Sequence, residues 1–205
     1  MPTPLDLIAD WPVPSASAAV VGDAGVIASY GDTAAQFRLA SVTKPLAARA
    51  AQAAVEEGVL ELDTPAGPPG STIRHLLSHA SGLAMHSAEV MAEPGKRRVY
   101  SNYGFQVLAE AIEAEAGIEF GRYLSEAVFE PLGMRHTDLR GGSLAHGAWS
   151  TGADLARFAA ELLRPTLIHA ETLAEATTVA YPDLAGIVPG YGHQNPNDWG
   201  LGFEI

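Results

Sequence analysis

Cysteine is absent from this 205-residue sequence, and lysine occurs only at Lys44 and Lys96. Without cysteine the chain can form no disulfide bond, no thiolate zinc site and no iron–sulfur cluster, and it cannot use a cysteine nucleophile. Positive charge is scarce as well, because 12 Lys and Arg residues stand against 24 Asp and Glu residues and the formal net charge is −12. That charge repels polyanions, so we expect no nucleic-acid partner.

Long apolar runs are also lacking, and no stretch has the pattern of a signal peptide or of a membrane-spanning helix. We therefore expect a cytoplasmic protein with no membrane partner. Apolar residues still make up 47% of the chain, which is ordinary for a globular protein, and a chain of this length buries about 70% of its unfolded surface. We expect one domain over residues 1–205.

Strand patterns lie at the two ends of the chain and helical patterns lie between them. Apolar runs around a glycine-containing turn, and alternation elsewhere, predict strands at residues 18–21, 26–28, 36–39 and 199–205. Apolar positions at helical spacing predict helices at about residues 42–57, 103–116, 120–128 and 151–162. This order fits an α/β (α+β) fold in which strands from both termini form an antiparallel sheet and a helical region, about residues 42–165, is inserted.

Lys44 stands among apolar residues at the start of an expected helix, three residues after Ser41. Positions i and i+3 share one face of a helix, so the hydroxyl and the amine can meet. A helix N-terminus and burial both disfavour a cation, and a neutral lysine can accept the proton of a serine nucleophile. The alternative is that Ser41 caps the helix and that Lys44 is exposed.

A second motif, Tyr100-Ser101-Asn102, directly precedes another expected helix. A tyrosine close to a cationic lysine can have its pKa lowered and carry protons. Asn102 offers both a donor and an acceptor, which suits a substrate amide. The alternative is that Ser101 or Asn102 caps the helix and that Tyr100 only packs beside it.

Together the two motifs resemble those of the serine β-lactamase and penicillin-binding-protein superfamily, in its branch of class C β-lactamases, DD-peptidases and family VIII esterases. Residues 37–45 read like the nucleophile segment of that branch, and Tyr100-Ser101-Asn102 matches its Tyr-x-Asn motif. Residues 73–83 are similar to its I-R-x-L-L-x-H-x-S-G-L signature. The resemblance implies a β-lactamase/transpeptidase-like fold, and no cofactor or metal is expected.

The resemblance also implies a role for each residue of the two motifs. Ser41 is expected to be the acylated nucleophile, with its backbone N–H as one half of the oxyanion hole, and Lys44 is expected to activate it. Tyr100 is expected to carry the proton to the leaving group and to help activate the deacylating water, and Asn102 to hold the acyl-side amide. The expected substrate is a small molecule: a β-lactam, a peptide amide or an ester.

The match ends before the third motif of the family. Members continue into a strand that carries Lys-Thr-Gly or His-x-Gly and supplies the second oxyanion-hole amide, whereas this sequence ends with residues 199–205. We therefore expect a C-terminally incomplete domain whose last strand has an exposed edge that favours self-association. The alternative function is a non-catalytic binding or structural protein of the same fold, although the presence of all four motif residues favours an enzyme.

Two smaller groups have simpler interpretations. His75 and His79 have the spacing of a metal-binding pair but lack the glutamate of His-Glu-x-x-His, and the resemblance places His79 at a structural turn. Residues 96–98 form a small basic cluster, which we expect to be solvated.

Overall fold

The computed structural model describes residues 4–205, so residues 1–3 of the predicted domain lie outside the described residues. The strands are β1 (Ala18–Gly22), β2 (Gly25–Tyr30), β3 (Gln36–Arg38), β4 (Arg98–Val99), β5 (Asp138–Leu139), β6 (Ala148–Thr151), β7 (Gly186–Val188) and β8 (Gly192–Gln194). The helices are η1 (Pro4–Asp10), η2 (Ala40–Val42), α1 (Thr43–Glu56), α2 (Ile73–Leu77), α3 (Asn102–Ala116), α4 (Phe120–Leu124), η3 (Ser125–Phe129), α5 (Gly152–Leu163) and α6 (Ala170–Ala176). The mixture of helices with mainly antiparallel strands confirms the predicted fold class.

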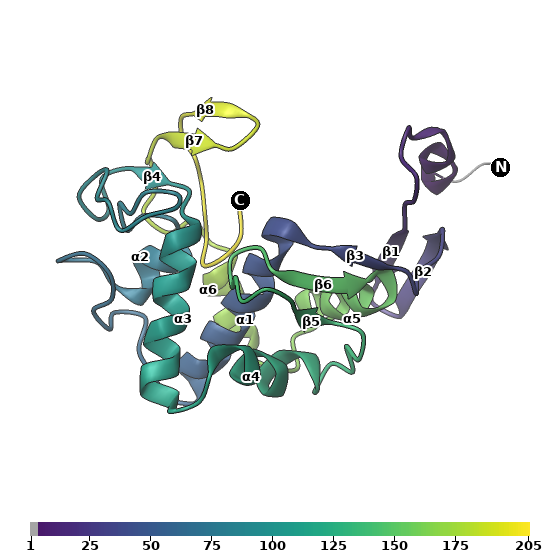
Figure 1. Ribbon diagram of the computed structural model, residues 1–205, viewed down its shortest axis with the longest axis horizontal. Helices are drawn as coiled ribbons and strands as arrows, with labels where there is room; N and C mark the ends of the chain where they lie inside the picture. The colour runs from purple at the N-terminus through teal and green to yellow at the C-terminus, as the bar shows by residue number, and fades with distance from the viewer. Residues whose placement is uncertain (1–3) are drawn as a thin grey trace.

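Helix α1 lies at the centre of the molecule (Figure 1), with α3 on one side and the strands β5 and β6 on the other. Its sequence is rich in alanine, and five alanines, Ala47, Ala48, Ala50, Ala51 and Ala54, are at most 2% exposed. Small side chains on all faces allow neighbouring elements to approach closely, which is why this helix is buried all round rather than on one stripe. The same core includes Leu46 of α1 and Phe105, Leu108 and Ile112 of α3.

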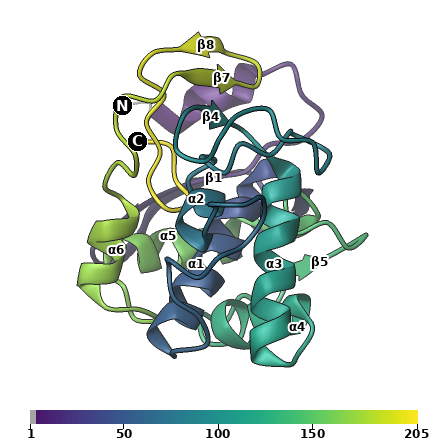
Figure 2. The ribbon, with the colours of Figure 1, turned by 90° about the vertical axis from the view of Figure 1, so that its left-hand side faces the viewer.

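Within residues 4–205 the strands form three small sheets. β1 and β2 form an antiparallel hairpin against which α5 packs, and β3, β6 and β5 form a second antiparallel sheet. β7 pairs in parallel with β4 and antiparallel with β8 (Figure 2). In the part of the chain that the structure describes, the strands from the two ends therefore lie in separate sheets, unlike the single sheet expected from the sequence.

Residues 199–205 do not form the expected strand. Trp199 and Glu204 are joined only by an isolated bridge, and the turn between them is closed by the N–H of Gly200, which donates to the carbonyl of Phe203 at 2.8 Å. Gly202 has a φ of +99°, and any side chain at this position would collide with Ala48 of α1. The segment folds into a tight turn because glycine allows its backbone to lie directly on the central helix.

The turn of residues 199–205 bears on the exposed strand edge that the sequence predicts for this segment. Trp199 and Leu201 are only 8% and 2% exposed, and the N–H of Leu201 donates to the carbonyl of Ala176 at 2.8 Å. The unpaired edge expected at residues 199–205 is therefore not formed there. Self-association of the chain stays a prediction.

The predicted helices are present, with one difference. The side chain of Thr151 caps α5 by accepting from the N–H of Asp154, and α3 ends at Gly117, whose φ of +72° closes the helix. The helix predicted over residues 120–128 is instead α4 followed by the wider π turn of η3.

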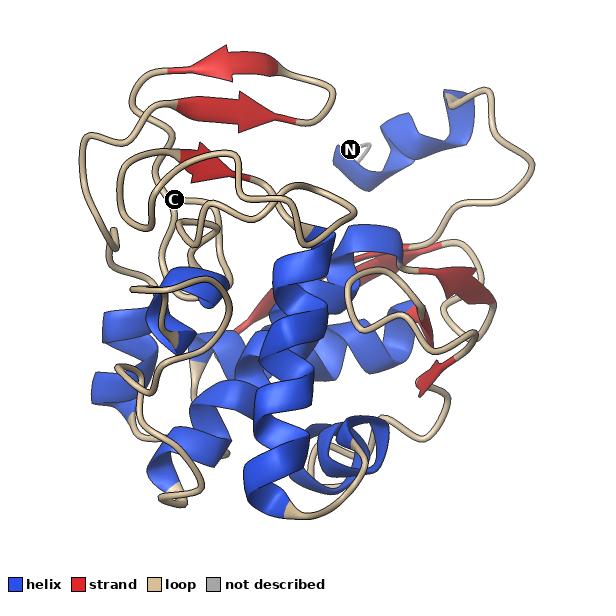
Figure 3. Cartoon of the chain, turned by 60° about the vertical axis from the view of Figure 1, so that its left-hand side comes forward, coloured by secondary structure: helices blue, strands red, loops and turns tan. Residues whose placement is uncertain are grey.

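Figure 3 shows the helices gathered together with the strands at their periphery. Within residues 4–205, no helix combines the length and apolar content needed to cross a bilayer.

Arg98 is buried, with 1% of its surface exposed, so the expectation of a solvated basic cluster is wrong at this position. Its Nε donates to the carbonyl of Asn197, its Nη1 to that of Ser78, and its Nη2 to those of Ala180 and Tyr181, at 2.6–3.0 Å. Burial lowers the pKa of the guanidinium to about 10. One side chain thus joins three chain segments that are distant in sequence.

Replacing Arg98 with methionine should lower the free energy of unfolding by about 3 kcal/mol, because four carbonyls, two of them in fully buried hydrogen bonds, lose a charge-assisted donor. The matched control is Arg97→Met, since Arg97 is exposed, and its effect should stay within about 0.5 kcal/mol. Urea unfolding followed by circular dichroism measures both values. Equal stability of the two variants would show that the Arg98 contacts are energetically neutral.

Candidate active site

Ser41 lies where β3 leads through η2 into α1. The preceding residue, Ala40, has a φ of +47°, which costs an alanine about 1–2 kcal/mol and turns the chain sharply before the serine. The turn is fixed by Thr43, whose hydroxyl donates to the carbonyl of Ala40 at 2.7 Å and accepts from the N–H of Ala148 at 3.1 Å. Ser41 is left exposed, in the short helical turn η2 that directly precedes α1.

Lys44 lies beneath Ser41 and is 2% exposed. Its Nζ lies 3.4 Å from the Oγ of Ser41, 2.7 Å from the Oδ1 of Asn102 and 2.9 Å from the carbonyl oxygen of Ala145. Burial lowers the pKa of the Lys44 amine to about 8. The structure therefore brings Ser41, Lys44 and Asn102 together.

The alternative interpretation of Ser41 as a helix cap does not describe this geometry. The residues at the N-caps of η2 and α1 are Leu39 and Val42, and neither makes a side-chain capping bond. Lys44 is also buried rather than exposed. An amine placed in an apolar interior at the expense of its solvation is typical of functional sites, where pKa values are shifted.

Tyr100 lies over the same amine, with the Nζ of Lys44 4.6 Å from the centroid of its ring. Burial raises the pKa of Tyr100, and a hydrogen bond with Ser41 offsets part of that increase. The expected lowering of this pKa by Lys44 is thus wrong, because desolvation of the phenolate outweighs the other influences. Tyr100 is protonated at neutral pH and can donate a proton near Ser41.

Asn102 is the first residue of α3, and its neighbour Ser101 caps that helix. The Oγ of Ser101 accepts from the N–H of Gly104 at 2.8 Å and donates to the carbonyl of Ala84 at 2.7 Å. Since Ser101 satisfies the cap, the side chain of Asn102 is free to bond Lys44. The Nδ2 of Asn102 lies 3.5 Å from the Nδ1 of His86. The capping alternative is therefore correct for Ser101, while Asn102 belongs to the site.

Ser41, Lys44 and Tyr100 line a cavity of about 420 Å³. Its other walls are mainly apolar and come from distant parts of the chain: Val42, Pro45, Met85, Val188, Pro189, Tyr191, Trp199, Gly202, Phe203 and Glu204. Apolar walls around a few convergent polar groups are usual in small-molecule sites, and this volume lies in the range of such sites.

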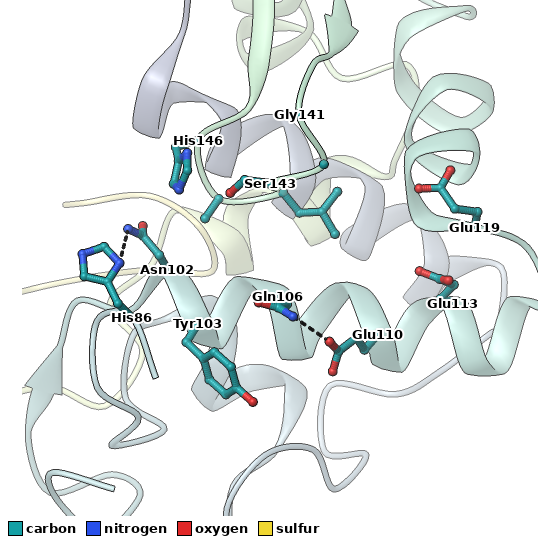
Figure 4. Close-up of a pocket in the computed structure, with 13 residues that line it drawn as sticks. His86, Asn102, Tyr103, Gln106, Glu110, Glu113, Glu119, Gly141, Ser143 and His146 are labelled. Atoms are coloured by element: carbon teal, nitrogen blue, oxygen red, sulfur yellow. Dashed lines mark hydrogen bonds between the residues drawn. The ribbon is translucent and has the colours of Figure 1, made fainter. Parts of the chain in front are cut away.

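A second cavity, of about 580 Å³, adjoins the same site but does not include Ser41 (Figure 4). It extends along α3 from Asn102 past Gln106 and Glu110, opposite the loop of residues 141–146. Asn102 and Ala145 line this cavity and also accept hydrogen bonds from Lys44. Lys44 lines the first cavity and its two acceptors line the second, so the two cavities lie next to each other.

Two components of the site have no signal in the sequence. The carbonyl of Ala145 accepts from a lysine 101 positions away, and a backbone acceptor leaves no side-chain pattern. The wall formed by Trp199 and Phe203 depends on the turn of residues 199–205, and that of Tyr191 on the connection between β7 and β8, rather than on a motif. Among residues 4–205, no group of three or more His, Asp or Glu side chains is placed to hold a metal ion.

Comparison with known proteins identifies the family to which the chain belongs. The sequence profile described as Beta-lactamase matches residues 7–204, and the chain therefore belongs to the beta-lactamase family. Its fold is that of a beta-lactamase from Mycobacterium bovis, with a TM-score of 0.98 and 66% identity over 99% of this chain and 75% of that one.

Curated relatives are more distant. Penicillin-binding protein 4* of Bacillus subtilis is 30% identical over 134 residues, which is 49% of this chain and 30% of that protein. The D-alanyl-D-alanine-carboxypeptidase/endopeptidase AmpH of Escherichia coli is 26% identical over 163 residues, which is 57% of this chain and 42% of that protein. The chain thus spans less than half the length of either relative.

Proposed function

We propose that the protein is a serine hydrolase that forms an acyl-enzyme on Ser41. The observation that carries this proposal is the set of partners around the Nζ of Lys44. Two of them, the Oδ1 of Asn102 and the carbonyl of Ala145, can only accept. When Lys44 is neutral, its two N–H groups are directed to these oxygens, and its lone pair is left for the hydroxyl of Ser41. The hydrogen-bond partners thus orient the amine as a base.

The reaction follows from this arrangement. The Oγ–H proton of Ser41 passes to the neutral amine of Lys44 while Oγ forms a bond to the substrate carbonyl carbon. The developing oxyanion lies near the start of α1, where the backbone N–H of Ser41 and the helix dipole stabilise negative charge. As the tetrahedral intermediate collapses, the bond to the leaving group breaks and Tyr100 gives the leaving group its proton. Water then attacks the acyl carbon and passes a proton to the Tyr100 phenolate. As the bond from that carbon to Oγ breaks, Lys44 returns its proton to Oγ and the acid leaves.

The site has room for the acyl side of a substrate beside Asn102. Its Nδ2 donors face the second cavity, where an amide or ester carbonyl can accept from them. The relatives named above include a carboxypeptidase and a penicillin-binding protein, and the M. bovis structure is described as a beta-lactamase. A small ester, a peptide amide and a β-lactam are therefore the three substrate classes that we propose.

A substrate panel tests this proposal. A p-nitrophenyl ester, the chromogenic cephalosporin nitrocefin and a peptide ending in D-Ala-D-Ala each report one class. We expect turnover of at least one of them at a rate that is proportional to enzyme concentration. No turnover of any of them, with the protein folded by circular dichroism, would favour the non-catalytic binding or structural alternative.

The pH profile tests the role of Lys44. Because the base is the neutral amine and its pKa is lowered to about 8, kcat/KM should rise with pH and level off above about pH 8.

The lowered pKa of Lys44 also affects stability, since between about pH 8 and pH 10.5 the unfolded chain holds a proton that the folded chain has lost. The free energy of unfolding should therefore gain a contribution from Lys44 as pH rises from about 8 towards 10.5.

The control for this assignment is Asn102→Asp. A carboxylate 2.7 Å from the Nζ stabilises the ammonium and raises its pKa. The midpoint of the pH profile should move upwards in this variant, whatever the loss in absolute rate. A midpoint that does not move would show that the profile reports another group.

A further inference from the structure

His79 is a buried histidine next to the candidate site that has no role in the reaction described above. It is 1% exposed, and its φ is +56°, a conformation that few non-glycine residues adopt. Such a conformation persists only where the surrounding contacts determine it strongly. Its own N–H donates to the carbonyl of Leu76 and its ring packs on Phe105, and its other contacts are with the segment that carries Tyr100 and with Trp199.

Two hydrogen bonds join His79 to the backbone on either side of Tyr100. The N–H of Val99 donates to the carbonyl of His79 at 2.9 Å, and the N–H of Ser101 donates to its Nδ1 at 3.1 Å. The left-handed backbone allows the carbonyl and the side chain of one residue to accept from both amides. The backbone of Tyr100 is therefore held at both of its ends by a single residue.

The imidazole ring also fixes the ring of Tyr100. The two ring centroids lie 4.4 Å apart with an angle of 34° between the planes. Trp199 packs against the imidazole edge-on, with centroids 4.6 Å apart at 83°. These distances are those of favourable aromatic contacts. Tyr100 is thus held through its side chain as well as through its backbone.

His79 cannot share in proton transfer in this arrangement. A backbone amide only donates, so the Nδ1 that accepts from Ser101 carries no hydrogen and the neutral ring is protonated at Nε2. Burial, together with the charges of Lys44 and Arg98, lowers the pKa of His79 well below its ordinary value. Among the described residues, the Nε2 has no hydrogen-bond partner. The residue can act only through its contacts.

We infer that His79 is a positioning residue, which holds the Tyr100 hydroxyl over Ser41 and fixes the start of α3 from which Asn102 projects. The effect of His79 on rate rests on the proposed function. Its effect on structure rests only on its hydrogen bonds with Val99 and Ser101. A displacement of about 1 Å at a reacting group lowers the rate by about 10²-fold.

Two variants of similar shape separate the hydrogen bond from simple packing. In His79→Asn the Oδ1 takes the place of Nδ1 as acceptor, and asparagine tolerates a positive φ. In His79→Leu the acceptor is lost. We expect His79→Leu to lower kcat by about 10²-fold with little change in KM, and His79→Asn to recover activity to within about tenfold of the wild type. The control is His75→Leu, since His75 contacts Thr72 and Tyr181 and not the site.

Amide hydrogen exchange of Ser101, measured by NMR, tests the hydrogen bond from this amide to His79 without any substrate. We expect protection of this amide in the wild type and in His79→Asn, and its loss in His79→Leu. Where leucine prevents folding, His79→Phe removes the acceptor and keeps a ring. Equal Ser101 protection in the acceptor-lacking variant and the wild type would overturn the inference, as would equal kcat values for His79→Leu and His75→Leu. A wild type that shows no turnover but a protected Ser101 amide, with that protection lost in His79→Leu, would reject the proposed function and would still establish the contact of His79 with the Tyr100 segment.

Discussion

Replacement of Ser41 by alanine is expected to lower kcat/KM by about 10⁴-fold to 10⁶-fold for every substrate that the protein hydrolyses. In the proposed mechanism the Oγ forms the acyl bond, and alanine offers no substitute. The side chain is exposed, so its removal should leave the free energy of unfolding nearly unchanged. Steady-state kinetics on the best substrate of the panel and thermal unfolding measure the two quantities.

Ser15 provides the matched control, because it is an exposed serine in the segment before β1. Ser15→Ala should retain the activity of the wild type. A Ser41→Ala protein that keeps more than about one tenth of the wild-type activity would show that another group carries the nucleophile, since loss of a nucleophile has a far larger effect.

Lys44→Met is expected to lower kcat/KM by about 10⁴-fold, the upper end of the range for loss of a general base. Methionine fills a similar volume but cannot accept the Ser41 proton. The substitution should not destabilise the protein, because desolvation of Lys44 disfavours the folded state at neutral pH. The free energy of unfolding at pH 7 should therefore be equal to or higher than that of the wild type.

Lys44→Arg separates the base from the charge. Arginine keeps a cation in place and stays protonated at neutral pH. It should be as inactive as Lys44→Met, while Lys96→Met, at the exposed lysine, should be fully active. Substantial activity of Lys44→Arg would mean that the site needs a positive charge rather than a neutral amine.

The pairing of Ser41 with Lys44 could be predicted from the sequence because it is local. Ser41 in η2 and Lys44 in α1 lie on consecutive helical turns, where side chains three positions apart are neighbours. The partners that orient the amine are 58 and 101 positions away, at Asn102 and Ala145. Of these, only Asn102 belongs to a recognisable motif, so the sequence indicates the candidate nucleophile and its candidate base but not the full geometry that orients them.

The buried surroundings explain the differences between prediction and structure. Alternating apolar residues at 199–205 are typical of a strand, but contacts with α1 and the φ of Gly202 select a turn. Arg98 is positioned by four carbonyls that come together only in the folded chain. Likewise, proximity to Lys44 suggests a lowered pKa for Tyr100, whereas its burial raises it. Each difference arises from burial, which local sequence does not encode.

The most direct test of the account is the intact mass of the protein after brief incubation with a slowly hydrolysed β-lactam or an activated ester. We expect one added acyl group, located on the peptide that contains Ser41, and no addition to Ser41→Ala. Turnover by the wild type without such an adduct, or the same adduct on Ser41→Ala, would contradict an acyl-enzyme on Ser41.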